Sequence, residues 1–215
     1  DTWPPFDTTG TPIFFGPDGL LSGEAPGEAG TASFTFDPAD PFPTLGGPLL
    51  LMPFGPYDQR AVSEGREDYL AFVSEPLEQP LEITGRVRVR LFVSTDAPDT
   101  DFTAKLLDIY PDGREINMLD NIQRVKFRNG FEEAAPLLDD PEEIVEVTVD
   151  LWSTSWVVNT GHRLAVHISS SNYPRFEVNP NTGEDFPGET LRPAQQTIHF
   201  GPEHPSALLL PIREE

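Results

Sequence analysis

Apolar and polar residues alternate with a period of two along most hydrophobic segments, and this pattern restricts the chain to a β-rich fold. Leu81–Ser94 is the longest example. Its predicted inner face has Ile83, Val87, Val89, Leu91 and Val93, and its outer face Arg86, Arg88 and Arg90. The alternation recurs in Thr31–Phe36 and Ile144–Leu151. Because no segment shows a helical period over more than about two turns, we predict an all-β, antiparallel sandwich of roughly eight or more strands.

The other predicted strands are short and are separated by loops rich in proline and glycine, of which the chain has 24 and 17. These strands are Ile13–Phe15, Tyr69–Ser74, Phe102–Tyr110, Gln123–Arg128, Arg163–Ser169, Thr197–Phe200 and Ala207–Pro211. Tyr69–Ser74 is apolar enough to be central in its sheet. Trp152 and Trp156 share one face of a helix, which predicts a helical turn within Leu151–Asn159. A jelly roll with long loops is the preferred form of the sandwich.

The charge of the chain excludes two classes of partner. It has 36 acidic and 14 basic residues, a formal net charge of −22. Such a surface repels nucleic-acid phosphates and anionic membranes, so neither is an expected partner. No apolar run reaches the ~18–20 residues of a membrane-spanning helix.

The length of the chain predicts a single domain, and its lack of cysteine bears on the compartment. One sandwich can occupy all 215 residues, so we predict a single domain over 1–215. The chain has no cysteine, which fits a cytoplasmic protein and leaves secretion open. Its first residues include neither Met nor a basic segment, so no signal peptide is expected and Asp1 indicates a domain boundary or a proteolytic end. Self-association stays open.

The segment from His167 to Gly183, HISSSNYPRFEVNPNTG, differs from every predicted strand. Its prolines remove backbone donors, and its asparagines tolerate turn conformations, which predicts a long, shaped loop. The residues that give it this character are Asn172, Tyr173, Pro174, Arg175, Phe176, Asn179, Pro180 and Asn181. The loop either covers the end of the sandwich or docks onto another domain.

Neither histidine nor serine forms a recognisable catalytic motif in the sequence. The four histidines, His162, His167, His199 and His204, lack metal-ligand spacing and any HExxH pattern. No Gly-x-Ser-x-Gly elbow occurs. We therefore expect Ser169–Ser171 to hydrogen-bond the loop backbone, His162 to be structural, and no cofactor to be bound.

Two further patterns suggest ligands, each with a structural alternative. Asp96, Asp99 and Asp101 cluster in one turn and are a weak calcium candidate, although they lack the spacing and the terminal Glu of an EF-hand. Alternatively, their carboxylates accept backbone N–H groups in an Asx-turn. Trp152 and Trp156 could form a sugar platform, but packing into the core or an interface is favoured.

Several segments together resemble one family of enzymes. Besides the loop, they are Arg66–Leu77 with Leu81–Gly85, Val93–Phe102 with Leu107–Gly113, Ile122–Arg128 and Gly161–Leu164. In this order they resemble the C-terminal β-domain of the X-Pro dipeptidyl-peptidase and cocaine-esterase (CocE/NonD) serine hydrolases. The resemblance extends over nearly the whole chain.

The resemblance implies a non-catalytic domain. It implies a galactose-binding-like jelly roll, with residues 1–12 as an extended crossover from an N-terminal α/β-hydrolase domain. The Ser-Asp-His triad of the parent enzyme, which hydrolyses an ester or peptide bond, then lies outside this chain. The predicted contacts with the catalytic domain are Trp3, Tyr173, Arg175, Phe176 and Asn179. The alternative function is a carbohydrate-binding module.

Six basic residues on two predicted strands form outward-facing rows: Arg86, Arg88, Arg90, Arg124, Lys126 and Arg128. We predict that carboxylates on neighbouring strands, such as Glu146 and Asp150, neutralise them by cross-strand pairing. The other interpretation is a basic patch that binds an acidic partner.

Overall fold

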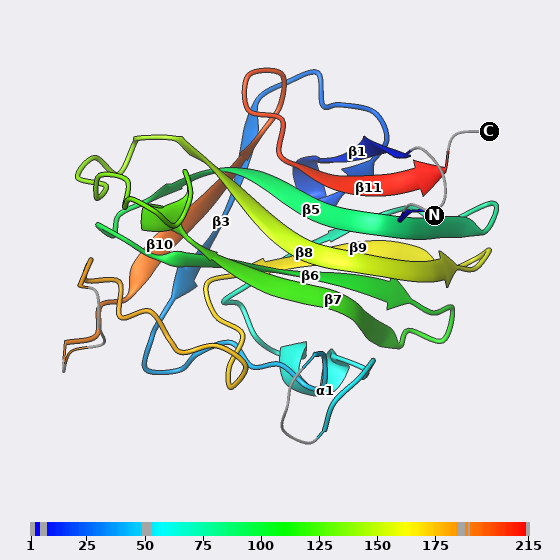
Figure 1. The fold of residues 1–215 in the computed structure, drawn as a ribbon, viewed down its shortest axis with the longest axis horizontal. Helices are drawn as coiled ribbons and strands as arrows, with labels where there is room; N and C mark the ends of the chain where they lie inside the picture. The colour runs from blue at the N-terminus through cyan, green and yellow to red at the C-terminus, as the bar shows by residue number, and fades with distance from the viewer. Residues whose placement is uncertain (1–2, 5–7, 49–52, 185–187, 189, 214–215) are drawn as a thin grey trace.

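The computed structural model of the chain describes residues 3–4, 8–48, 53–184, 188 and 190–213. Two antiparallel sheets pack face to face (Figure 1). Sheet A has the order β2 (Leu21–Ser22), β1 (Thr8–Phe15), β11 (Ala207–Arg213), β5 (Leu81–Thr95), β10 (Ala194–Phe200) and β3 (Gly30–Phe36), with β8 (Val145–Val158) also paired to β5. Sheet B has the order β4 (Leu70–Val73), β9 (Arg163–Ser169), β6 (Asp101–Ile109) and β7 (Glu115–Arg124). The predicted antiparallel sandwich is confirmed.

Strand β5 is a central strand of sheet A and pairs with three others. One edge pairs with β8 over most of its length, and the other pairs first with β11 and then with β10. The alternating apolar residues of β5 are fully buried against sheet B, as predicted. Phe15 of β1 stacks on Phe72 of β4 at 4.2 Å between ring centroids, which joins the two sheets within one core.

Two of the outward arginines of β5, Arg86 and Arg88, lie close to a carboxylate on the adjacent strand β8. The Asp150 carboxylate accepts from Arg86 Nε at 2.7 Å and lies 4.0 Å from Arg88 Nε. Arg124 reaches Asp101 at 2.9 Å. Arg90 and Arg128 donate to backbone carbonyls instead. Pairing through Asp150 is therefore confirmed, whereas Glu146 stands opposite Phe92.

Three predicted elements are wrong in detail. The chain leaves sheet B after Arg124 and forms the 3₁₀ turn Val125–Phe127, so Lys126 is buried rather than exposed. No helical turn surrounds Trp152, because β8 continues through it with a bulge. The strand within Tyr69–Ser74 pairs only with β9 in sheet B, so it is an edge strand and not a central one.

Two long excursions cover the outer face of sheet B. The first links β3 to β4 and includes the single helical turn α1 (Arg60–Ser63); the second links β9 to β10. Both run below β7 in the view of Figure 1, and they meet in a parallel bridge between Pro43 and Tyr173. Regular strands therefore form the core, whereas the proline-rich segments shape one side of the molecule.

Candidate docking surface

The predicted docking loop begins where β9 ends and lies against the first excursion. Ser171 Oγ donates to Phe42 O at 3.3 Å. The Tyr173 N–H donates to Phe42 O at 3.0 Å, and the Thr44 N–H donates to Tyr173 O at 2.7 Å. These backbone contacts explain why Ser171 and its neighbour Asn172 are buried. The serine hydroxyl bonds loop backbone, as the sequence predicted.

Arg175 fixes the loop to sheet B from the inside. Its Nη1 donates to Asp120 O at 2.7 Å and also contacts the Asp120 carboxylate. Asn172 Nδ2 donates to the other oxygen of that carboxylate. The Asp120 side chain is fully buried and Arg175 is only 15% exposed. Burial lowers the pKa of the Arg175 guanidinium, and Asp120 opposes this shift.

A second internal anchor lies further along the loop. Asn179 Nδ2 donates to Asp101 Oδ1 at 2.9 Å, and Arg124 Nε donates to the same oxygen at 2.9 Å. Asn179 is 2% exposed. Of the residues predicted to contact a second domain, Arg175 and Asn179 therefore have partners within this chain.

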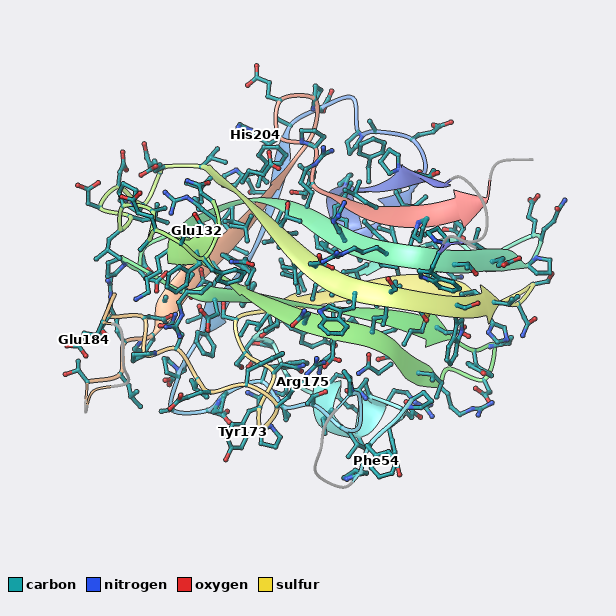
Figure 2. The ribbon with its side chains drawn as sticks, viewed as in Figure 1. Phe54, Glu132, Tyr173, Arg175, Glu184 and His204 are labelled. Carbon is teal, nitrogen blue, oxygen red and sulfur yellow. The ribbon has the colours of Figure 1, made fainter. Side chains whose placement is uncertain are left out.

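The remaining predicted contact residues are more accessible. Tyr173 is 51% exposed and Trp3 is 61% exposed, while Phe176 is half-buried beneath the Arg175 guanidinium. Figure 2 shows Tyr173 on the same lower side of the molecule as Phe54, which is 59% exposed. Trp3 lies beside Pro4, which packs near Gly85 of β5. In the described part of the chain, no hydrogen bond or ring contact joins Trp3 to Tyr173.

The calcium candidate consists of side chains with other partners. The Gln195 N–H donates to Asp96 Oδ1 at 2.9 Å, and the Lys126 N–H donates to Asp99 Oδ1 at 2.9 Å. Burial raises the pKa of both Asp99 and Asp101, and Arg124 opposes the shift at each. Over the described part of the chain, no three His, Cys, Asp or Glu side chains are arranged to hold a metal ion.

Charged side chains also lie buried beneath the first excursion. Lys105 of β6 is 2% exposed, and its Nζ donates to Pro43 O at 2.9 Å and to Gln59 Oε1 at 3.4 Å. Its register neighbours are Asp120 in β7 and His167 in β9. Burial lowers the pKa of Lys105 to about 7, and burial together with Lys105 lowers that of His167 to about 3. His167 is therefore neutral at pH 7.

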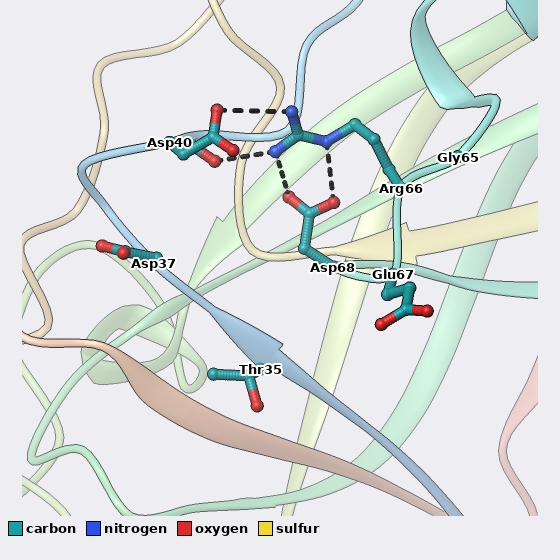
Figure 3. A pocket seen from close by; sticks show the side chains of 7 residues that line it. All are labelled: Thr35, Asp37, Asp40, Gly65, Arg66, Glu67 and Asp68. Atoms are coloured by element: carbon teal, nitrogen blue, oxygen red, sulfur yellow. Dashed lines mark hydrogen bonds and ion pairs between the residues drawn. The ribbon is translucent and has the colours of Figure 1, made fainter.

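An acidic hollow of about 530 Å³ lies between the beginning and the end of the first excursion (Figure 3). Arg66 crosses it, donating to the Asp68 carboxylate at 2.7–2.8 Å and to Asp40 O at 2.7 Å. Arg66 therefore joins the beginning of the first excursion, at Asp40, to its end, at Asp68. The described side chains that line this hollow are four carboxylates, Arg66 and Thr35, with no histidine to activate the Thr35 hydroxyl.

Two histidines, His162 and His199, each have one hydrogen-bonded side-chain partner, and neither pair extends to a catalytic triad in the described residues. His162 Nδ1 lies 2.7 Å from Asp108 Oδ1 in a buried hydrogen bond, which supports the predicted structural role. Ser94 Oγ lies 2.8 Å from His199 Nε2, a pair that the sequence did not suggest because 105 residues separate its members. Burial, and to a lesser extent His204, lowers the pKa of His199. No carboxylate is bonded to the His199 ring in the described residues.

A family model described as the X-Pro dipeptidyl-peptidase C-terminal non-catalytic domain matches residues 1–209. The chain belongs to this family. The resemblance noted from the loop and its companion segments is therefore confirmed. Members of the X-Pro dipeptidyl-peptidase C-terminal family are non-catalytic parts of larger hydrolases. None of the described helices is long and apolar enough to cross a bilayer.

Relatives of this C-terminal domain are larger hydrolases. The chain is 44% identical over 224 residues to the cocaine esterase of Rhodococcus sp. (strain MB1 Bresler), covering 98% of this chain and 38% of that protein. An aminopeptidase from the marine sediment archaeon Thaumarchaeota archaeon superposes with a TM-score of 0.88 at 29% identity, covering 100% of this chain and 38% of that one. An α-amino acid ester hydrolase gives 0.86 at 32% identity, covering 95% and 36%. The chain thus spans less than two fifths of these relatives.

Proposed function

We propose that this chain is the non-catalytic β-sandwich domain of a serine hydrolase and that it packs against and stabilises an N-terminal α/β-hydrolase domain of the same polypeptide. The family match over residues 1–209 supports this proposal, together with the 38% coverage of cocaine esterase at 44% identity. We place the parent protein in the cytoplasm, because the chain has no cysteine.

The substrate class of the parent follows from the chemistry that its relatives share. An esterase, an amino acid ester hydrolase and an aminopeptidase all break an acyl bond to oxygen or nitrogen. A serine nucleophile does this through an acyl-enzyme, which requires an activated hydroxyl and a donor pair for the oxyanion.

Ser94, although hydrogen-bonded to a histidine, is not placed as such a nucleophile. It is 7% exposed and lies within the regular strand β5. It lacks the exposed elbow that presents such a nucleophile.

We expect the isolated chain to show no turnover of p-nitrophenyl acetate or of an X-Pro p-nitroanilide, whereas the full-length parent hydrolyses at least one of them. Release of p-nitrophenol or p-nitroaniline is followed by absorbance. Because Ser94 and His199 are hydrogen-bonded, Ser94→Ala is the matched control. Purified wild-type chain that turns over either substrate, and loses this activity on Ser94→Ala, would contradict the non-catalytic assignment.

A further inference from the structure

An uncharged hollow of about 390 Å³ opens at the β7/β8 edge of the sandwich. Its apolar walls come from Pro48, Phe54, Pro56, Met118, Leu119 and Trp156. None of the described residues that line it is charged, although 23% of the chain is charged and the net charge is −22. Four other hollows each include at least one carboxylate residue. This edge therefore differs from the acidic surface around it.

Trp152 is on the strand that lines this hollow and has a strained backbone conformation. It is two residues before Thr154, a lining residue on the same strand. Its φ of 72° is in the left-handed region, and its side chain is 72% exposed. A bulky residue in this region is an outlier, and its backbone conformation is strained. An exposed ring gains no burial in the core to offset that strain.

The residues around Trp152 hold it in this conformation. The Trp152 N–H donates to Asp150 Oδ1 at 3.0 Å. The same carboxylate accepts from Arg86, and Asn121 Nδ2 donates to Asp150 O at 2.6 Å. The bulge lies between the pairs Val87–Trp152 and Arg88–Asp150, so the strand itself is shaped to turn at this point. The bulge and these hydrogen bonds therefore hold Trp152 in its exposed position on β8.

We propose that Trp152, Phe54 and the hollow lined by Met118, Leu119 and Trp156, here called the β7/β8 groove, form the docking surface for the catalytic domain. This inference rests on the proposed function. Interface centres are enriched in Trp, Phe and Met and depleted of charge, which matches this groove. More than half of each large relative lies outside the matched region, so a partner domain of sufficient size exists in those proteins.

Other occupants fit the groove less well. A second copy of this chain would bring two surfaces of net charge −22 together, which opposes association. A sugar would require a set of polar groups around an aromatic platform, and the only polar side chains among the described lining residues are Asn117 and Thr154.

The test compares hydroxyl-radical footprints of the isolated chain and of the full-length parent by mass spectrometry. We expect oxidation of Trp152 and Phe54 to fall several-fold in the parent. Phe131 is the matched control, because it is 80% exposed and adjoins Glu132, well separated from Phe54 in Figure 2. Its oxidation should not change. Protection of a different surface would show that the β7/β8 groove is not the docking surface and would leave the proposed function intact. Absence of protection anywhere would contradict both.

A substitution separates docking from an internal role. Glycine adopts positive φ without strain, so Trp152→Gly should leave the unfolding midpoint of the isolated chain unchanged or raise it. In the full-length parent we expect the same substitution to lower the midpoint of thermal inactivation. An equal loss in both proteins would show that Trp152 acts within the sandwich. Protection of Trp152 by oligosaccharides, with none from the catalytic domain, would also overturn the proposal.

Discussion

Replacing Arg175 by alanine is expected to lower the free energy of unfolding of the isolated chain by about 3–5 kcal/mol. The substitution leaves the Asp120 carboxylate fully buried without the Arg175 cation, and among the described residues only Asn172 still donates a hydrogen bond to it. Loss of one partner of a buried ion pair has a large effect because the remaining charge stays out of water. The loop that Arg175 holds should also exchange its amide hydrogens faster.

Equilibrium unfolding in urea measures the stability, and hydrogen exchange of residues 170–183 reports on the loop. Arg86→Ala is the matched control, since Arg86 also pairs with an aspartate but is 58% exposed. Its effect should be much smaller, because water screens exposed pairs. Replacing Arg175 and Asp120 together with Met and Leu should recover much of the lost stability. If Arg175→Ala costs no more than Arg86→Ala, the buried anchor has been misassigned.

The sandwich could be predicted because its strands obey a local rule. Burial on one face imposes a period of two, and β3, β5 and the hydrophobic half of β8 follow it. Prediction failed where a tertiary contact replaced that rule. Spacing alone suggested a helix around Trp152, whereas pairing of β8 with β5 continues past it through a bulge. A bulge inserts one residue and shifts the pattern, so periodicity alone cannot locate it.

The loop could be recognised from its sequence, but the direction in which its side chains act could not. Arg175 and Phe176 suggested an external surface, since Arg and aromatic residues are common at interfaces. The partner of Arg175 is Asp120, 55 residues earlier in the chain, and only the fold brings the two together. Lys105 gave no signal either, because in the sequence it is one polar residue within a predicted strand, and the first excursion, whose Pro43 O accepts from its Nζ, covers it only in the fold.

Lys105 should make the unfolding free energy strongly dependent on pH. Burial lowers its pKa from 10.5 to about 7 in the folded chain. Between these values the unfolded chain binds a proton that the folded chain does not, so stability rises with pH across this window and is lost as the pH falls toward 7. A shift of this size corresponds to a change on the order of 5 kcal/mol between pH 7 and pH 10.5.

Lys105→Met isolates this contribution, since it retains a long side chain and removes the titrating amine. Urea unfolding of both proteins at intervals from pH 7 to pH 9.5 gives the difference in slope, which should approach about 1.4 kcal/mol per pH unit in mid-window. Titration of groups present in both proteins largely cancels in this comparison. His167 stays neutral throughout, because its pKa is lowered to about 3. Equal pH slopes for the two proteins would mean that Lys105 keeps an ordinary pKa, with Asp120 and Asp68 holding it charged in the fold.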